Sequence, residues 1–82
     1  MTQLVPTISG VVAYTTAIEL YWNNDPHATE VLVAPTGQSG DASFSSCPIT
    51  GLNPGTVYTF TIDNMAPGYA AGSAQVQVMT LN

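Results

Sequence analysis

Few side chains in this sequence can carry out acid–base or nucleophilic chemistry. His27 is the only histidine, Cys47 is the only cysteine, and no lysine or arginine is present. A base-activated nucleophile would have to use His27, which follows Asp25 and Pro26 in a run of turn-forming residues. A solvated turn residue is the expected role there. Cys47 precedes Ile49 by two positions and so shares its face in a strand, which favours a buried small hydrophobe over a reactive thiol.

The carboxylates are spread along the chain and form no catalytic pattern. There are five of them: Glu19, Asp25, Glu30, Asp41 and Asp63. Glycoside hydrolysis needs two carboxylates facing each other across a cleft, whereas Glu19 and Asp63 occupy strand positions expected to point outward. The chain has neither a Cys/His cluster for zinc nor an Asp-x-Asp loop for calcium. We therefore predict no enzyme, and no catalytic, cofactor-binding or metal-binding residues.

The formal net charge of −5 without any cationic side chain excludes several classes of partner. Nucleic-acid backbones and anionic membrane surfaces are both bound through lysine and arginine. No stretch is long enough to span a bilayer, and the start of the chain lacks the features of a signal peptide. A surface solvated by Thr, Ser, Asn and Gln explains the missing cations simply. A surface that resists trypsin-like proteases outside a cell is the sharper alternative.

Strand-like alternation organises the chain, and its 82 residues fit one domain with a core over about residues 6–80. Residues 17–23 and 57–63 alternate apolar and polar side chains with the period of a half-buried strand. No segment has a capped helical period. Further strands are expected at residues 6–14, 30–34, 43–50 and 73–80, with residues 38–42 forming a loop or a brief edge strand. Six or seven short strands predict an all-β sandwich.

Prolines limit where two of these strands can lie in a sheet. Pro6 can begin an edge strand but would break a central ladder, so the start of the first strand is expected to fray. Pro48 interrupts residues 43–50 and indicates an edge strand or a bulge.

Two separated motifs resemble fibronectin type III domains. Residues 51–56 read GLNPGT, and the spacing of Leu52, Pro54 and Tyr58 places a tyrosine at the head of a strand, where its hydroxyl can bond the preceding corner. Trp22 ends an earlier strand, as a buried tryptophan does in that family. The resemblance implies an immunoglobulin-like sandwich of fibronectin type III topology. The expected core residues are Trp22, Leu52, Tyr58, Phe60 and Ile62.

In that family the loops after the second and sixth strands share one end of the sandwich. The resemblance therefore makes that end a candidate contact surface, and Tyr21 is a further candidate on an outer sheet face. The candidate contact residues are Asn24, Asp25, His27, Tyr69 and Tyr21. The Arg-Gly-Asp sequence by which some family members bind integrins is absent, since the chain has no arginine.

The leading hypothesis is a non-catalytic structural or interaction module on a larger assembly, such as a surface or decoration protein of a phage-like virion. A spacer or adhesion module of a multidomain extracellular or bacterial surface protein is an alternative. A carbohydrate-binding sandwich that stacks sugars on Tyr14, Tyr21 or Tyr69 is another. Protein partners are expected, together with self-association through strand edges. The expected location is a virion or cell surface, without membrane insertion.

Overall fold

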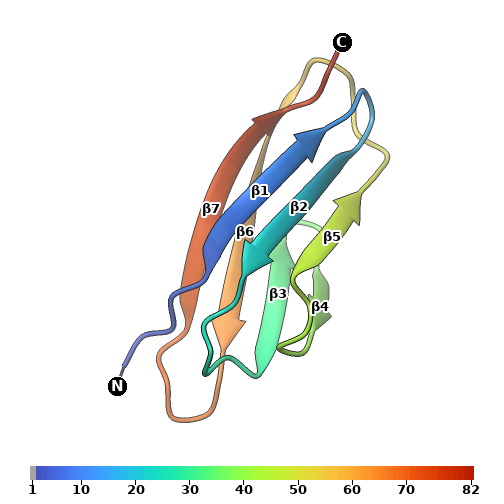
Figure 1. The fold of residues 1–82 in the computed structure, drawn as a ribbon. Helices are drawn as coiled ribbons and strands as arrows, with labels where there is room; N and C mark the ends of the chain where they lie inside the picture. The colour runs from blue at the N-terminus through green and yellow to red at the C-terminus, as the bar shows by residue number, and fades with distance from the viewer. Residues whose placement is uncertain (1) are drawn as a thin grey trace.

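Seven β-strands, without a helix, make up the computed structural model over residues 2–82, the part of the chain that it describes (Figure 1). One sheet has three strands in the order β1-β2-β5, and the other has four in the order β4-β3-β6-β7. All strand pairs within the two sheets are antiparallel. The strands are β1 (Thr7–Ala13), β2 (Ile18–Asn23), β3 (Glu30–Ala34), β4 (Gln38–Gly40), β5 (Ser46–Ile49), β6 (Val57–Met65) and β7 (Gly72–Met79).

The two sheets pack face to face in an elongated sandwich that measures 44 × 18 × 17 Å. Strands β1 and β7 are neighbours across the two sheets along one side (Figure 1). Every strand that the sequence predicts is present, and residues 38–40 form the brief edge strand β4. The prediction of an all-β sandwich of six or seven antiparallel strands is confirmed.

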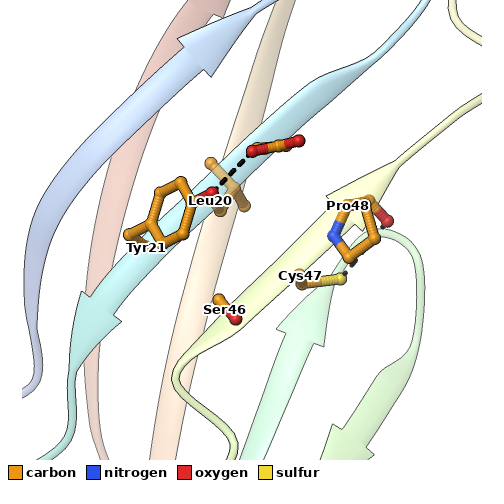
Figure 2. Close-up of a pocket in the computed structure, with 6 residues that line it drawn as sticks. Leu20, Tyr21, Ser46, Cys47 and Pro48 are labelled. Atoms are coloured by element: carbon orange, nitrogen blue, oxygen red, sulfur yellow. Dashed lines mark hydrogen bonds between the residues drawn. The ribbon is translucent and has the colours of Figure 1, made fainter.

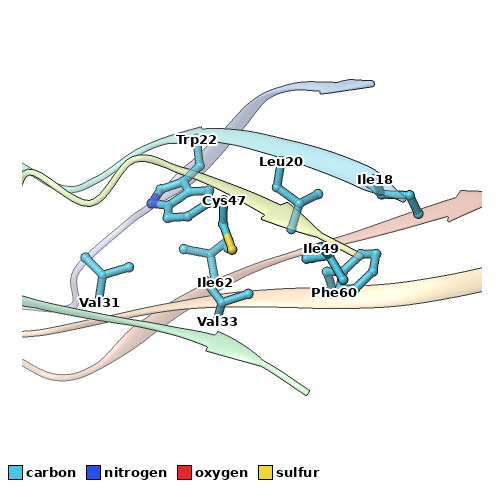
Figure 3. Close-up of a cluster of buried hydrophobic side chains, with 9 residues drawn as sticks. All are labelled: Ile18, Leu20, Trp22, Val31, Val33, Cys47, Ile49, Phe60 and Ile62. Atoms are coloured by element: carbon cyan, nitrogen blue, oxygen red, sulfur yellow. The ribbon is translucent and has the colours of Figure 1, made fainter. Parts of the chain in front are cut away.

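The core lies between the sheets and is built from alternate residues of four strands (Figure 3). In β2, Ile18, Leu20 and Trp22 are buried, while the residues between them face outward. This alternation is what a strand with one covered face requires. The buried cluster consists of Ile18, Leu20, Trp22, Val31, Val33, Cys47, Ile49, Phe60 and Ile62.

The corner before β6 has the geometry that the spacing of Leu52, Pro54 and Tyr58 suggests. The backbone N–H of Asn53 donates a hydrogen bond of 2.8 Å to the hydroxyl oxygen of Tyr58. Tyr58 and Leu52 are half-buried and pack against the core cluster. The tyrosine thus ties the corner to the strand that follows it.

Two strand boundaries differ from the prediction by more than one residue. Strand β5 begins at Ser46 rather than at residue 43, because Asp41 holds the preceding residues in a turn. Its carboxylate accepts hydrogen bonds from the backbone N–H and the hydroxyl of Ser43, an arrangement that competes with strand pairing. Strand β6 continues to Met65, beyond the predicted end at residue 63, since Asn64 pairs with both Val31 and Gly72.

The segment before β1 is anchored, whereas the sequence predicts a frayed start. Leu4 is only 2% exposed, and its N–H donates to the carbonyl of Ala70 at 3.0 Å. The N–H of Ala70 donates in turn to the carbonyl of Thr2. A Cβ on Gly72 would overlap the carbonyl group of Leu4, so only glycine allows this close approach.

Candidate functional site

The loops after β2 and β6 meet at one end of the sandwich, close to the N-terminal segment (Figure 1). There the rings of His27 and Tyr69 stack, with centroids 4.9 Å apart and planes inclined by 22°. The His27 side chain is 60% exposed, as expected of a turn residue. Two of the candidate contact residues therefore form one aromatic pair, in which His27 is exposed and Tyr69 is half-buried.

Asn24 has a structural role at this end. Its side-chain oxygen accepts hydrogen bonds from the indole N–H of Trp22 at 2.8 Å and from the amide of Asn64 at 3.1 Å. Its own amide donates to the carbonyls of Ala42 and Phe44. Four partners within the chain use the hydrogen-bonding capacity of this side chain. Asn24 thus connects both sheets to the loop before β5, with little capacity left for a partner.

Asp25 is also engaged by its own chain. One carboxylate oxygen accepts the N–H of His27 at 2.9 Å and lies 3.1 Å from the Nδ1 atom of the same residue. The other oxygen accepts the N–H of Val5 at 2.9 Å. These bonds, first from the His27 backbone and then from that of Val5, lower the pKa of Asp25. The carboxylate holds the N-terminal segment against the loop after β2.

We expect Asp25→Asn to lower the melting temperature at neutral pH, because an amide cannot accept both backbone N–H groups. Because the pKa of Asp25 is lower in the folded state, its carboxylate stabilises the fold above the unfolded value of about 3.8. This stabilisation is lost as the pH falls through the folded-state pKa. The difference between wild type and variant should therefore shrink below pH 3.8. Thermal unfolding from pH 7 to pH 2.5 checks this, with Glu30→Gln, at an exposed residue, as the control for charge. A difference that does not vary with pH would contradict the role of the carboxylate.

The outer face of the three-stranded sheet carries a second polar–aromatic group. The Tyr21 hydroxyl donates to one oxygen of Glu19 at 2.5 Å, and the Tyr14 hydroxyl lies 3.4 Å from the other. The hydrogen bond to Glu19 and the charge of that carboxylate raise the pKa of Tyr21, which keeps the phenol protonated. We call Tyr14, Glu19 and Tyr21 the tyrosine–glutamate group.

Small neighbours leave the ring of Tyr21 open to solvent. Its cross-strand partners are Gly10 in β1 and Ser46 in β5, and Tyr21 remains 41% exposed. Beside it a hollow of about 190 Å³ opens between β2 and β5 (Figure 2). The side chains of Ser46 and Pro48 are short, whereas Tyr21 and Glu19 are long, and this difference produces the hollow. Its lining is formed by Glu19, Leu20, Tyr21, Ser46, Cys47 and Pro48.

Cys47 borders this hollow, but its thiol belongs to the core. The residue is 2% exposed, and its Sγ contacts the side-chain oxygen of Gln38. Burial raises the pKa of the thiol. A thiol that is buried and protonated is a poor nucleophile.

Within residues 2–82, no three side chains of His, Cys, Asp or Glu lie close enough together to hold a metal ion. The same residues contain no helix with the length and apolar character needed to cross a membrane.

Two features of these surfaces do not emerge from the sequence analysis. Glu19 is expected there only as an outward-pointing acid, yet it joins the two exposed tyrosines into one group. Its position two residues before Tyr21, on the same face of one strand, is the available signal. Asn64 follows the strand predicted at residues 57–63, yet it is completely buried and bonded to Asn24.

Comparisons with known proteins show a similarity of fold. No protein-family model matches it, and neither does any curated protein. Solved structures do match, including one described as a computer-based redesign of a β-sandwich protein. That structure aligns over 100% of this chain and 97% of its own, with a TM-score of 0.71 and 16% sequence identity. At this identity the likeness shows the fold alone, which is a β-sandwich.

Proposed function

We propose that this chain is a non-catalytic interaction module of the fibronectin type III kind, displayed on the surface of a larger assembly. A phage-like virion, on which the chain serves as a surface or decoration protein, is the first candidate. The exposed tyrosine–glutamate group is the observation that carries the proposal of an interaction module.

The strand order and the Tyr58 corner support the assignment to the fibronectin type III kind. Three strands in the order β1-β2-β5 face four in the order β4-β3-β6-β7. This is an antiparallel sandwich of seven strands, and the resemblance of the sequence implies a sandwich of six or seven. The hydrogen bond from Asn53 to Tyr58 closes the corner before β6. The lack of lysine and arginine supports display on a surface, because trypsin-like proteases find no cleavage site there.

The exposed groups favour the outer face of the three-stranded sheet as the contact surface. At the loop end, Asn24 and Asp25 are engaged within the chain, which leaves the stacked pair of His27 and Tyr69. On the sheet face, Tyr21 presents an open ring above a hollow. Tyrosine suits interfaces because its ring buries apolar area while its hydroxyl keeps a partner.

Size separation followed by native mass measurement of the source material tests this proposal. The chain should migrate with a particle or complex much larger than itself, and a chain found only as a free monomer would contradict the proposal. Tyr21→Ser should reduce this association, whereas Tyr69→Ser, which changes the other candidate surface, should preserve it. The opposite pattern would place the contact at the loop end. Unchanged melting temperatures would show that both variants remain folded.

A further inference from the structure

We propose that the hollow beside Tyr21 receives an arginine side chain from a basic partner protein. This inference rests on the proposed function and names the chemistry that the partner must present. The charge of the chain, the free acceptor capacity of Glu19 and the open ring of Tyr21 each support it.

The charge balance of the chain favours a cationic partner. The net charge is −5, and the chain has no cation of its own to neutralise Glu19. Among residues 2–82 the only contact between an acidic and a basic side chain, that of Asp25 with His27, lies at the loop end. A basic partner surface would therefore be attracted at long range and would supply the missing counter-charge.

Glu19 retains acceptor capacity in a fixed position. A carboxylate offers about four lone-pair sites. The short bond from Tyr21 uses one of these on one oxygen, while the Tyr14 hydroxyl approaches the other oxygen only at 3.4 Å. These contacts restrain the carboxylate and leave sites for a planar guanidinium, whose paired N–H donors match a carboxylate well.

The ring of Tyr21 offers a stacking surface next to that carboxylate. Neither Gly10 nor Ser46 has a side chain that would cover it, and a Cβ on Gly10 would meet no atom within 4 Å. Arginine stacks on tyrosine and pairs with a carboxylate at the same time, which the compact ammonium of lysine does less well. The Ser46 hydroxyl on the opposite wall adds a further acceptor.

The same groups suit a neutral sugar less well. A sugar hydroxyl needs acceptors and donors in a fixed pattern, and the phenol of Tyr21 already directs its hydrogen to Glu19. A carboxylate is an acceptor only, and the negative charge of the chain gives no advantage to a neutral ligand. The group as a whole is matched to a cationic donor.

Titration of the labelled protein with the peptide acetyl-GRGRGRG-amide, followed in amide NMR spectra at low salt, tests this inference. Shifts should concentrate on residues 19–21 and 46–47, and replacing each arginine with uncharged citrulline should abolish them. Glu19→Gln should raise the Kd about tenfold or more, since hydrogen bonds to charged groups are the strong ones. Glu30→Gln removes the same charge from the other sheet and should raise it less than about twofold.

Equal weakening by Glu19→Gln and Glu30→Gln would overturn the inference, because it would indicate attraction by net charge alone. Binding of the citrulline peptide with the same affinity would also overturn it. So would binding of a neutral oligosaccharide such as cellohexaose that is lost in Tyr21→Leu, which would assign the hollow to glycans. The spectrum of each variant reports folding directly. Association with a larger assembly is measured separately, so the proposed function can stand where this inference fails.

Discussion

Replacing Trp22 with alanine should lower the free energy of unfolding by about 3–5 kcal/mol. The indole is 2% exposed and lies between the two sheets (Figure 3). It meets the ring of Phe44 edge-on, with ring centroids 5.1 Å apart. Its N–H also donates to Asn24, so the substitution opens a cavity and removes a bond from the polar network. For 82 residues a stability of roughly 4–12 kcal/mol is expected, so much of it would be lost.

Trp22→Phe provides the matched control. It keeps an aromatic ring in the core and loses mainly the donor to Asn24, whose oxygen still accepts from Asn64. A loss of about 1–2 kcal/mol is expected. Urea unfolding followed by circular dichroism measures both variants without relying on tryptophan fluorescence. Equal stability of the alanine and phenylalanine variants would contradict the placement of Trp22 in the core.

Asn64→Asp should be strongly destabilising near neutral pH, by about 3–5 kcal/mol. Asn64 is completely buried, accepts the N–H of Asp25 at 2.8 Å and donates to the side-chain oxygen of Asn24. An ionised carboxylate there would be buried without a cation and would face the Asn24 oxygen. Asn64→Leu, which carries no charge, should lose about 1–3 kcal/mol through the broken hydrogen bonds.

The loss of unfolding free energy in Asn64→Asp should depend on pH. The loss in Asn64→Leu serves as the reference, because leucine does not titrate. Burial raises the pKa of the introduced carboxyl above its unfolded value of about 3.9. The protonated carboxyl group thus contributes its full stabilisation below the unfolded value of about 3.9. This stabilisation is lost as the pH rises through the folded-state pKa. The protonated form can also donate to Asn24. Urea unfolding at pH 4 and pH 7 should show the two variants converging at the lower pH, and a constant difference would contradict the network.

The strands that form the core were predictable because a strand covered on one face alternates apolar and polar side chains with a period of two residues. In β2 the residues between Ile18 and Trp22 alternate strictly, and in β6 the same holds for Phe60 and Ile62. Such a pattern specifies both the strand and the side that faces the core. The corner tyrosine was predictable for a similar reason, since Tyr58 contacts a residue close to it in the sequence.

Leu4 and Asn64 were not predictable from their local sequence. Leu4 stands shortly before a proline, and its burial depends on Ala70 and Gly72, which lie at the other end of the chain. Asn64 precedes a Gly- and Pro-rich stretch that indicates a loop. Its burial depends on bonds to Asn24 and Asp25 in the loop after β2. Contacts between segments far apart in the sequence therefore determine the burial of both residues.

The tyrosine–glutamate group was predictable in part. Alternation places Tyr21 on the outer face together with Glu19. The openness of its ring, however, depends on the register that sets Gly10 and Ser46 beside it. Register is a property of strand pairing, and the hollow between β2 and β5 is its consequence.

Photo-crosslinking in the native assembly tests the central claim most directly, namely that the chain binds a protein partner through the outer face of the three-stranded sheet. A photoreactive phenylalanine analogue would replace Tyr21, and in a second variant Gln77, which is exposed on the outer face of the other sheet. We expect an adduct with a partner protein from position 21 and none from position 77. Crosslinking from position 77 alone, or from neither position in an assembly that contains the chain, would contradict it.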